Sequence, residues 1–345
     1  MKNFGINGFG RIGRTAFRVW WNFHKDEIDL KAVNTSGSME IEDWAHLLKY
    51  DSNYGVWDQG MTVEHIKSTK EVSDEDSLLG YFVIDGRKIA VTAQRDPAKI
   101  PWQQFGVETV VESTGAFTSK DKASLHIQGG AKNVIISAPA KGEGIDTAVI
   151  GVNQVSGEVI SNASCTTNCV APVTAVILKT FGIQKATMTT VHAYTDDQNL
   201  QDNSHRDLRR ARTAGRNIIP TSTGAAVAVT ETLPELKGLF DGISMRVPVS
   251  VGSISDMVFV TGRPTTVEEV NKALTEASQQ DQWKGILAVT NEPLVSSDIV
   301  GRRESSIVDL ALTQVIAGDL VKVVSWYDNE WGYCNRLIEQ VSLVG

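Results

Sequence analysis

The feature that most constrains the fold of this chain is a glycine-rich hexapeptide near its start. Gly8-Phe9-Gly10-Arg11-Ile12-Gly13 follows the apolar stretch at residues 4–7 and leads into a helical pattern over residues 12–23. Glycines at this spacing permit a tight turn and let the backbone approach a pyrophosphate, which then lies at the positive end of the helix. A glycine-rich surface turn is the alternative, but the strand before the glycines and the helix after them favour dinucleotide binding.

The end of the second predicted strand bears on which dinucleotide binds. Proteins with this turn usually carry an acidic residue there, about 20 positions further on, that binds the ribose 2′-hydroxyl. Here the apolar run at residues 30–33 is followed by Asn34, Thr35 and Ser36, with no carboxylate. Without that charge a 2′-phosphate is not repelled, and Thr35, Ser36 and backbone amides could donate to it. NAD bound through fewer ribose contacts remains the alternative.

The first part of the chain alternates strands with helices. Strand patterns at residues 107–111 and 134–136 flank a helical pattern at residues 120–127. Strands separated by helices imply parallel crossovers. We therefore expect residues 1–164 to form a doubly wound, parallel α/β sheet of the Rossmann type.

The pattern changes after residue 165. A long apolar helix at residues 170–178 is followed by alternating strands, of which residues 243–249 and 253–260 look like antiparallel neighbours. Residues 307–316 and 320–327 flank a turn and predict a hairpin. We therefore expect residues 165–328 to form an α+β domain with a mainly antiparallel sheet.

Two helix starts are also predicted in this part of the chain. Thr266 and Glu269 fit a capping box. Asn329 is placed to cap a final helix over residues 329–345.

Composition narrows the class of protein. The chain has 345 residues, which exceeds what one hydrophobic core usually fills. Its 33 Lys and Arg against 41 Asp and Glu give a net charge of −8, which argues against a nucleic-acid partner. The three cysteines are too few and too odd in number for a disulfide framework, and no run is apolar enough for a signal peptide or a membrane span. We expect a soluble, cytoplasmic protein of two domains.

A second motif predicts a reactive thiol. Cys165 stands in a run of small hydroxyl residues just before the apolar helix, where the helix dipole stabilises a thiolate. The alternatives are an ordinary buried cysteine or a metal site shared with Cys169. The metal site is disfavoured because no second Cys/His pair follows at ligand spacing. Cys169 and Cys334 are interpreted as packing residues.

A nucleophilic cysteine requires a base, and His192 follows the predicted strand at residues 186–190. A structural role for this histidine stays open on the residues alone. Arginines at positions 206, 209, 210 and 212 could form a solvated face or a nucleic-acid patch. Their place after the thiol motif favours phosphate binding or a subunit contact.

These motifs together resemble the phosphorylating glyceraldehyde-3-phosphate dehydrogenases, over essentially the whole chain. The resemblance is carried by residues 6–14, 45–52, 161–169, 192–195, 207–212 and 326–333. The cysteine block and the block starting at Trp326 are each specific.

The resemblance implies a reaction in two stages. The Cys165 thiolate would attack the aldehyde of glyceraldehyde 3-phosphate, with His192 as the base that also keeps the thiol ionised. Hydride would pass to a nicotinamide, and inorganic phosphate would then attack the thioester to give 1,3-bisphosphoglycerate. The metabolic direction, glycolysis or gluconeogenesis, is left open, and no metal is expected.

The resemblance also implies binding residues and an assembly. Thr195 and Arg246 would hold the substrate phosphate. The attacking phosphate would be bound by Ser164, Thr166, Arg210, Thr223 and Gly224. The cofactor would be bound by Gly8, Gly10, Arg11, Ile12, Gly13, Asn34, Thr35, Ser36, Arg95, Ser137, Ser204 and Asn329. The C-terminal helix would return to the first domain, and the protein would be a homotetramer in which the loop at residues 194–218 packs against a neighbouring subunit.

In two places the chain departs from the NAD-specific members of that family. Those members carry Asp where Thr35 stands, and Leu-Pro where Asn203-Ser204 precedes His205. NADP-accepting members carry a small residue and Ser at these positions, so we expect a site for NAD or NADP that accepts NADP. An erythrose-4-phosphate dehydrogenase of the same fold, or a non-enzymatic binding role, remains an alternative.

Overall fold

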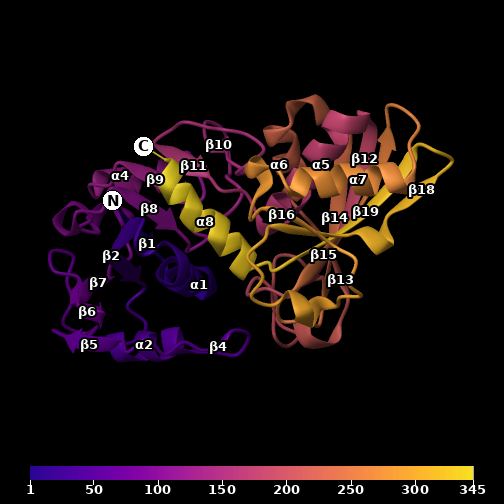
Figure 1. Ribbon diagram of the computed structural model, residues 1–345. Coiled ribbons are helices and arrows are strands. Elements are labelled where there is room, and N and C mark those ends of the chain that lie inside the picture. Colours follow the sequence, from indigo (N-terminus) through magenta and orange to yellow (C-terminus); the bar gives the residue numbers. More distant parts are fainter. Residues whose placement is uncertain (345) are drawn as a thin grey trace. The chain divides into compact units, whose positions relative to one another are not determined.

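The computed structural model describes residues 1–344 and divides into two compact units (Figure 1). The first unit contains residues 1–147, 155–162 and 334–345. The second contains residues 148–154 and 163–333. The short segment 148–154 belongs to the second unit because Val149 packs in its core and the Gly151 carbonyl accepts a hydrogen bond from Gln282. The predicted domain boundaries were at residues 164 and 328. The compact units instead change at residues 162/163 and 333/334, apart from the segment 148–154.

The first unit is built on a twisted sheet whose central strands run parallel. The strands are β1 (Lys2–Asn7), β2 (Ile28–Thr35), β5 (Thr62–His65), β6 (Leu78–Ile84), β7 (Arg87–Ala93), β8 (Thr109–Glu112), β9 (Asn133–Ile136), β10 (Asp146–Thr147) and β11 (Val159–Ser161). Their order is β10-β11-β9-β8-β1-β2-β7-β6-β5. Among the described residues of this sheet, only the pairs β5–β6 and β6–β7 are antiparallel. The prediction of a doubly wound parallel sheet is confirmed. The antiparallel extension β5–β6 was not predicted.

The helices of the first unit differ in detail from the predicted ones. They are α1 (Arg11–Val19), α2 (Ile41–Lys49), α3 (Lys120–Ala123) and α4 (Leu125–Gln128), and a small hairpin pairs β3 (Tyr50–Asp51) with β4 (Gly55–Val56). The predicted helix over residues 12–23 continues past α1 as a π-helical turn, Trp20–His24. The predicted helix over residues 120–127 is divided in two at Ser124.

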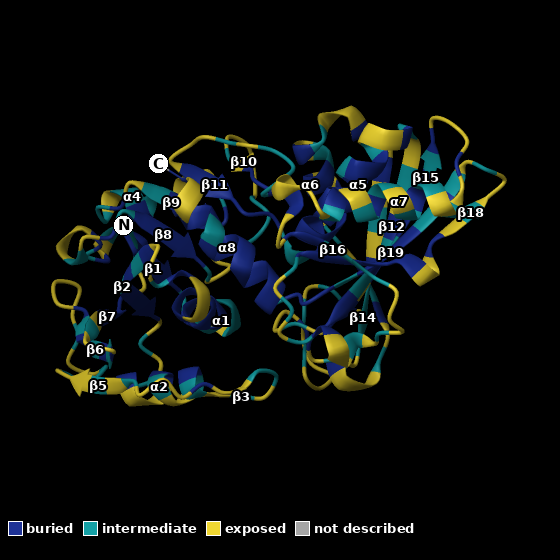
Figure 2. Ribbon diagram, viewed as in Figure 1, coloured by how far each residue is buried: buried dark blue, intermediate teal, exposed yellow. Residues whose placement is uncertain are grey.

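The second unit is built on a mainly antiparallel sheet, as predicted. Its strands are β12 (Ile183–Ala193), β13 (Ile219–Ser222), β14 (Phe240–Val247), β15 (Ser253–Thr261), β16 (Leu287–Thr290), β17 (Ser306–Asp309), β18 (Gln314–Ile316) and β19 (Leu320–Tyr327). Their order is β13-β14-β12-β15-β19-β17-β16, with β18 paired to β19. Three helices, α5 (Cys165–Phe181), α6 (Ala225–Thr232) and α7 (Val267–Ser278), pack together and against the sheet. Figure 2 shows exposed residues on the outer side of α7. Along β15, buried residues alternate with half-buried ones.

Two predictions about neighbours in the second sheet had different outcomes. The prediction that β14 and β15 are neighbours is wrong, because β12 lies between them, parallel to β14 and antiparallel to β15. The predicted hairpin is confirmed, since β17 and β18 both pair antiparallel with β19. Its first arm is interrupted by a 3-10 turn at Leu310–Leu312.

The structure corrects both predicted helix starts, the first in part and the second entirely. The Thr266 hydroxyl accepts from the Glu269 amide at the start of α7, but the Glu269 carboxylate binds Arg263 and Thr265, so only half of the capping box is present. The prediction that Asn329 caps the final helix is wrong. In α8 (Trp331–Leu343) that role falls to Asp328, whose Oδ1 accepts from the amides of Glu330 and Trp331 at 2.9 and 2.7 Å.

Within residues 1–344, no helix is long and apolar enough to cross a membrane. The remaining short 3-10 helices are Pro97–Lys99, Gln103–Phe105, Ala214–Arg216, Pro234–Leu236, Asp281–Trp283 and Ser296–Ile299.

Candidate functional site

The glycine-rich turn joins β1 to α1 through a backbone that only glycine tolerates. Gly8 has φ +91°, and a Cβ there would lie 2.7 Å from Thr114 Cγ2. A Cβ on Gly13 would lie 2.0 Å from the Gly8 carbonyl oxygen, so α1 starts in close contact with the strand. A Cβ on Gly10 would instead enter open space. The turn therefore leaves a cradle at the N-terminus of α1, where free amides suit a pyrophosphate.

A pocket of about 420 Å³ opens beside this turn, entirely within the first unit. It is lined by Asn7, Gly8, Phe9, Gly10, Asn34, Thr35, Ser36, Trp44, Gln94, Arg95, Ser113, Thr114 and Phe117. Six of the predicted cofactor residues are among them, namely Gly8, Gly10, Asn34, Thr35, Ser36 and Arg95. The lining offers glycine backbone, amides, hydroxyls, aromatic rings and one guanidinium, which fits a dinucleotide.

The remaining predicted cofactor residues do not line this pocket. Arg11 forms an ion pair with Asp51, so its side-chain charge already has a partner. Ile12 and Gly13 lie inside the first turn of α1, and Ser137 follows β9, where its amide donates to the Glu112 carbonyl at 2.9 Å. Ser204 and Asn329 belong to the second unit.

At the tip of β2, the hydroxyl expected to donate to a ligand is already engaged. Thr35 is 1% exposed, and its hydroxyl donates to the Thr92 carbonyl at 3.0 Å inside the sheet. The expectation that this hydroxyl binds a 2′-phosphate is therefore corrected. Ser36 is exposed, and the Arg95 Nε donates to its carbonyl at 3.2 Å, so these two residues remain at the pocket edge.

In the second unit, Cys165 is the first residue of α5, as the motif predicted. The preceding Ser164 caps the helix by accepting from the Thr167 amide at 3.0 Å. Ala163, before the cap, has φ +55°, a strained conformation for a residue with a side chain. This turn places the Cys165 thiol at the positive end of a helix of 17 residues, where a thiolate is stabilised.

His192 lies at the end of β12 with its ring against the thiol. Its Nε2 is 3.4 Å from Cys165 Sγ, and its Nδ1 is 2.6 Å from the Ala193 carbonyl oxygen. A carbonyl only accepts, so Nδ1 carries the hydrogen of a neutral ring and Nε2 is free to accept a proton. The geometry is that of a nucleophile beside its base.

Burial controls the charges of this pair. It raises the pKa of the Cys165 thiol, although Arg246 and Thr166 act in the opposite direction. It also lowers the pKa of His192 to about 4, and the positive charge of Arg246 adds to that effect. The resemblance implied a thiol kept ionised by His192, whereas burial favours a neutral thiol and imidazole before substrate arrives.

A buried tyrosine that the sequence did not single out supports the nucleophile. The Tyr327 hydroxyl is hydrogen-bonded to Thr166 Oγ1 at 2.9 Å and to Thr190 Oγ1 at 2.8 Å, and its ring contacts that of His192 edge-on. It thus joins α5 to β12 next to the reacting pair. The predicted packing role of Cys169 fits its complete burial, where burial raises its pKa to about 12.

Three of the predicted phosphate residues, Thr195, Arg210 and Arg246, lie together in a cationic cluster. Arg246 donates to the Thr195 hydroxyl, and its guanidinium is 3.7 Å from the Asp197 carboxylate. The same carboxylate pairs with Arg210 at 2.6 Å. Asp197, which sequence reasoning missed, is the counter-ion between two guanidiniums. The cluster suits an anion with several oxygens, because a phosphate rewards several donors at once.

The other predicted phosphate residues belong to two helix starts. Thr223 accepts from the Ala225 amide at 3.1 Å, and Gly224 precedes the first residue of α6. Arg210 is connected to the strand before α6, because its Nε donates to the Thr221 hydroxyl of β13 at 2.8 Å. Asn329, predicted to hold the nicotinamide, accepts from the Gly252 amide and the Ser253 hydroxyl through its Oδ1.

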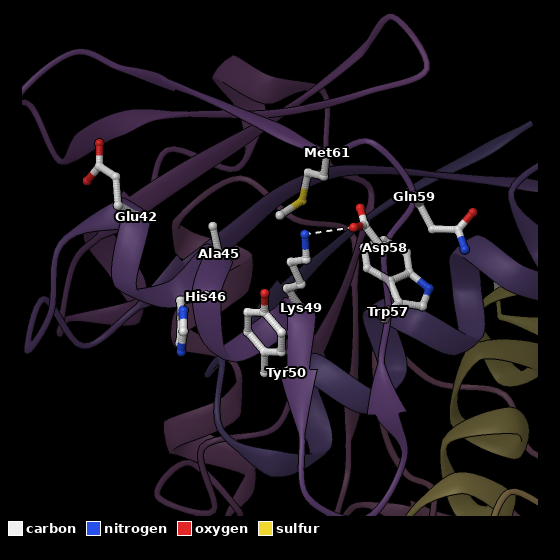
Figure 3. A pocket seen from close by; sticks show the side chains of 9 residues that line it. All are labelled: Glu42, Ala45, His46, Lys49, Tyr50, Trp57, Asp58, Gln59 and Met61. Atoms are coloured by element: carbon white, nitrogen blue, oxygen red, sulfur yellow. Dashed lines mark ion pairs between the residues drawn. The ribbon is translucent and has the colours of Figure 1, made fainter.

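A second pocket in the first unit, of about 190 Å³, lies along α2 (Figure 3). Lys49 points toward Asp58 and pairs with it at 2.7 Å, and the His46 ring contacts that of Tyr50 in a tilted arrangement. None of the predicted site residues lines it. Among the described residues, no group of three or more His, Cys, Asp or Glu side chains could hold a metal ion.

Comparisons with known proteins agree with this arrangement. Residues 2–120 match the NAD binding domain of glyceraldehyde 3-phosphate dehydrogenase, and residues 164–329 match its C-terminal domain. The chain is 51% identical to the glyceraldehyde-3-phosphate dehydrogenase of Streptomyces coelicolor, covering 99% of this chain and 98% of that one. It is 50% identical to glyceraldehyde-3-phosphate dehydrogenase 1 of Bacillus subtilis, over 99% and 97% of the two chains. It is 46% identical to a chloroplastic glyceraldehyde-3-phosphate dehydrogenase of Arabidopsis thaliana, over 98% and 82%. The chain therefore belongs to the glyceraldehyde-3-phosphate dehydrogenase family.

Proposed function

We propose that this protein is an NAD(P)-dependent oxidoreductase that converts glyceraldehyde 3-phosphate and inorganic phosphate to 1,3-bisphosphoglycerate, reversibly. The observation that carries the proposal is the approach of His192 Nε2 to Cys165 Sγ, 3.4 Å apart at the N-terminus of α5. A thiol with an adjacent proton acceptor is the equipment of covalent aldehyde oxidation. Family membership supports the same activity.

The first step forms a carbon–sulfur bond. Cys165 Sγ attacks the aldehyde carbon, and the thiol proton passes to His192 Nε2 and from there to the new alkoxide, giving a hemithioacetal. The helix dipole of α5 stabilises the developing thiolate. When bound, the dinucleotide supplies the acceptor of the hydride that leaves this carbon. His192 takes the hydroxyl proton as the hydride leaves, and a thioester remains on Cys165.

The second step releases the product. An oxygen of inorganic phosphate attacks the thioester carbonyl, the carbon–sulfur bond breaks, and Cys165 regains its thiol with the proton held by His192. We assign Thr195 and Arg246 to the phosphate of the substrate. We assign the attacking phosphate to Ser164, Thr166, Arg210, Thr223 and Gly224. Hydroxyls, helix-start amides and a guanidinium suit these tasks.

We propose that the pocket of the first unit binds the dinucleotide and accepts NADP as well as NAD. Among the described residues that line it there is no carboxylate, and the Arg95 Nε donates to the Ser36 carbonyl. A 2′-phosphate would therefore meet a guanidinium rather than a negative charge. Residues 1–164 would act as the dinucleotide domain, residues 165–328 as the catalytic domain, and Ser137, Ser204 and Asn329 as further cofactor contacts.

We also propose that the protein is a cytoplasmic homotetramer. The loop at residues 194–218 leaves apolar side chains in water, with Leu200 79%, Leu208 81% and Ile218 68% exposed. Several large apolar side chains exposed in one loop are typical of a subunit contact. Three free cysteines, one of them beside a base, suit a reducing compartment. Sedimentation should give the mass of four chains, and a monomer would contradict the assembly.

Turnover decides the main proposal. Reduction of NAD or NADP by glyceraldehyde 3-phosphate should require phosphate or arsenate and should be lost in Cys165→Ser. Cys169→Ser is the matched control, because it removes a buried thiol outside the reacting pair and should keep most of the activity. Activity retained by Cys165→Ser would refute the mechanism. Faster turnover of erythrose 4-phosphate without phosphate would favour the related dehydrogenase instead.

A further inference from the structure

A buried carboxylate that the mechanism does not use lies behind the dinucleotide pocket. Glu112, the last residue of β8, is 1% exposed. Its Oε2 accepts from Asn7 Nδ2 at 2.6 Å and from His126 Nε2 at 2.9 Å. Its Oε1 accepts from the Thr114 amide at 2.7 Å and from the Thr114 hydroxyl. Four donors from three residues converge on this group, so both of its oxygens have partners.

The proton on His126 is fixed by a tryptophan. His126 and Trp102 are both 0% exposed, and Trp102 Nε1 lies 3.1 Å from His126 Nδ1. An indole N–H can only donate, so Nδ1 accepts and the hydrogen of the neutral ring is on Nε2, facing Glu112. Trp102, His126 and Glu112 thus form a directed chain of hydrogen bonds.

This chain continues into the pocket wall. Asn7 Oδ1 accepts from Asn34 Nδ2 at 2.7 Å, and Asn34 Oδ1 accepts from the Gln94 amide at 3.0 Å. Asn7, Asn34, Gln94 and Thr114 all line the pocket. One carboxylate therefore ties the carboxyl ends of β1 and β8 together directly, and those of β2 and β7 through the two asparagines.

Thr114, which Glu112 holds, packs directly against the glycine-rich turn. The space that a Gly8 side chain would take is filled by Thr114, whose amide and methyl group lie 2.8 and 2.7 Å from a Cβ placed there. A shift of Thr114 would change the room at the turn where the pyrophosphate is expected. Glu112 holds Thr114 by two hydrogen bonds and Asn7, the residue before Gly8, by a third.

We propose that Glu112, with its hydrogen-bond chain to His126 and Trp102, is a positioning residue that fixes the wall of the dinucleotide pocket. This inference rests on the proposed function, because it takes the pocket to be the cofactor site. A purely structural role would affect folding stability without a specific effect on cofactor binding. The proposed role predicts weaker cofactor binding, with little change in the chemistry at Cys165.

The first test is Glu112→Gln in the full-length protein. The NH2 group of Gln would replace one of the two accepting oxygens. The donors that faced that oxygen, either those of Asn7 and His126 or those of Thr114, would then meet another donor. We expect the Kd for NAD, measured by calorimetry, to rise about tenfold, the effect of one buried group left without a partner. We expect kcat at saturating cofactor, and the rate of Cys165 alkylation by iodoacetamide without cofactor, to stay within about twofold. An unchanged or lower Kd would overturn the inference.

The second test keeps the inference open to refutation if Glu112→Gln does not fold. Trp102→Phe and Trp20→Phe each remove one indole N–H from a fully buried tryptophan of the same unit, since Trp20 Nε1 donates to the Ile28 carbonyl at 2.8 Å. Only Trp102 is connected to Glu112. We expect Trp102→Phe to raise the Kd for NAD about threefold and Trp20→Phe to leave it unchanged. Equal effects, or none, would overturn the proposed role, whereas a wild-type protein that binds neither NAD nor NADP would overturn the proposed function itself.

Discussion

Replacing Arg95 by methionine should lower kcat/KM for NADP about tenfold while leaving that for NAD within about threefold. The Arg95 Nε donates to the Ser36 carbonyl at 3.2 Å, which places the guanidinium at the strand tip where the adenosine ribose of a dinucleotide is expected. Two unit charges 4 Å apart in water attract by about 1 kcal/mol, and a phosphate monoester carries roughly 1.5 to 2 charges at neutral pH. Because Arg95 is exposed, salt screening reduces this attraction to about 1.4 kcal/mol, which is about tenfold in binding. NAD has no such phosphate and should lose little.

The assay is steady-state turnover with each cofactor at saturating aldehyde and phosphate. Arg95→Lys should retain most NADP activity because it keeps the charge. Arg87→Met is a matched control, since Arg87 lies on β7 of the same unit and pairs with Asp26 and Asp29 outside the pocket. The ratio of kcat/KM for NADP to that for NAD should fall in the wild type as salt is raised, whereas the same ratio for Arg95→Met should not. Equal losses for NAD and NADP would show that Arg95 does not act on a 2′-phosphate.

Three further predictions concern the second unit and the final helix. His192→Asn should lower kcat about 10² to 10⁴-fold by removing the proton acceptor beside Cys165, and a smaller loss in stopped-flow turnover would assign the base elsewhere. Arg246→Gln should raise KM for glyceraldehyde 3-phosphate. The same substitution should raise the pKa of His192 from about 4 toward its ordinary value, because it removes a positive charge that disfavours the imidazolium. An unchanged pKa in an NMR titration of the ring would contradict this prediction. Asp328→Ala should lower the free energy of unfolding by about 1 to 2 kcal/mol through loss of the α8 cap, with Asn329→Ala not producing a cap defect in urea denaturation.

The parts of the fold that could be predicted depend on signals between residues close in the sequence. The turn needs positive φ at Gly8 and no side chain at Gly13, so these glycines themselves indicate the strand–turn–helix arrangement. The reactive cysteine was found because the capping residue Ser164 and the apolar helix after it lie in one short segment. The central strands β1, β2, β8 and β9 of the first sheet were predicted from short apolar runs, and most strands of the second sheet from local alternation. No such signal predicted β5, β6, β7, β10, β11, β13 or β16.

The order of the strands could be predicted from the sequence only in part. The sequence separates the strand patterns that became β14 and β15 by a short turn, yet β12 lies between them in the sheet. Pairing with β12 gives each of these strands a long partner, and local periodicity does not encode that choice. Asn329 and Asp328 are likewise both suitable caps by residue type, and only the fold of β15 decides that Asn329 is used by Gly252 and Ser253.

By itself, the sequence determined the family, the two-domain α/β and α+β architecture, the position of the thiol at a helix start and the absence of an acidic residue after Asn34. Tertiary structure alone decided that the Thr35 hydroxyl faces the sheet, that Asp197 lies between two arginines, that Tyr327 supports the nucleophile and that Glu112 holds the pocket wall. The physical reason is the same in each case. The direction of a side chain depends on a hydrogen-bond partner that is distant in the sequence, and burial makes that partner obligatory.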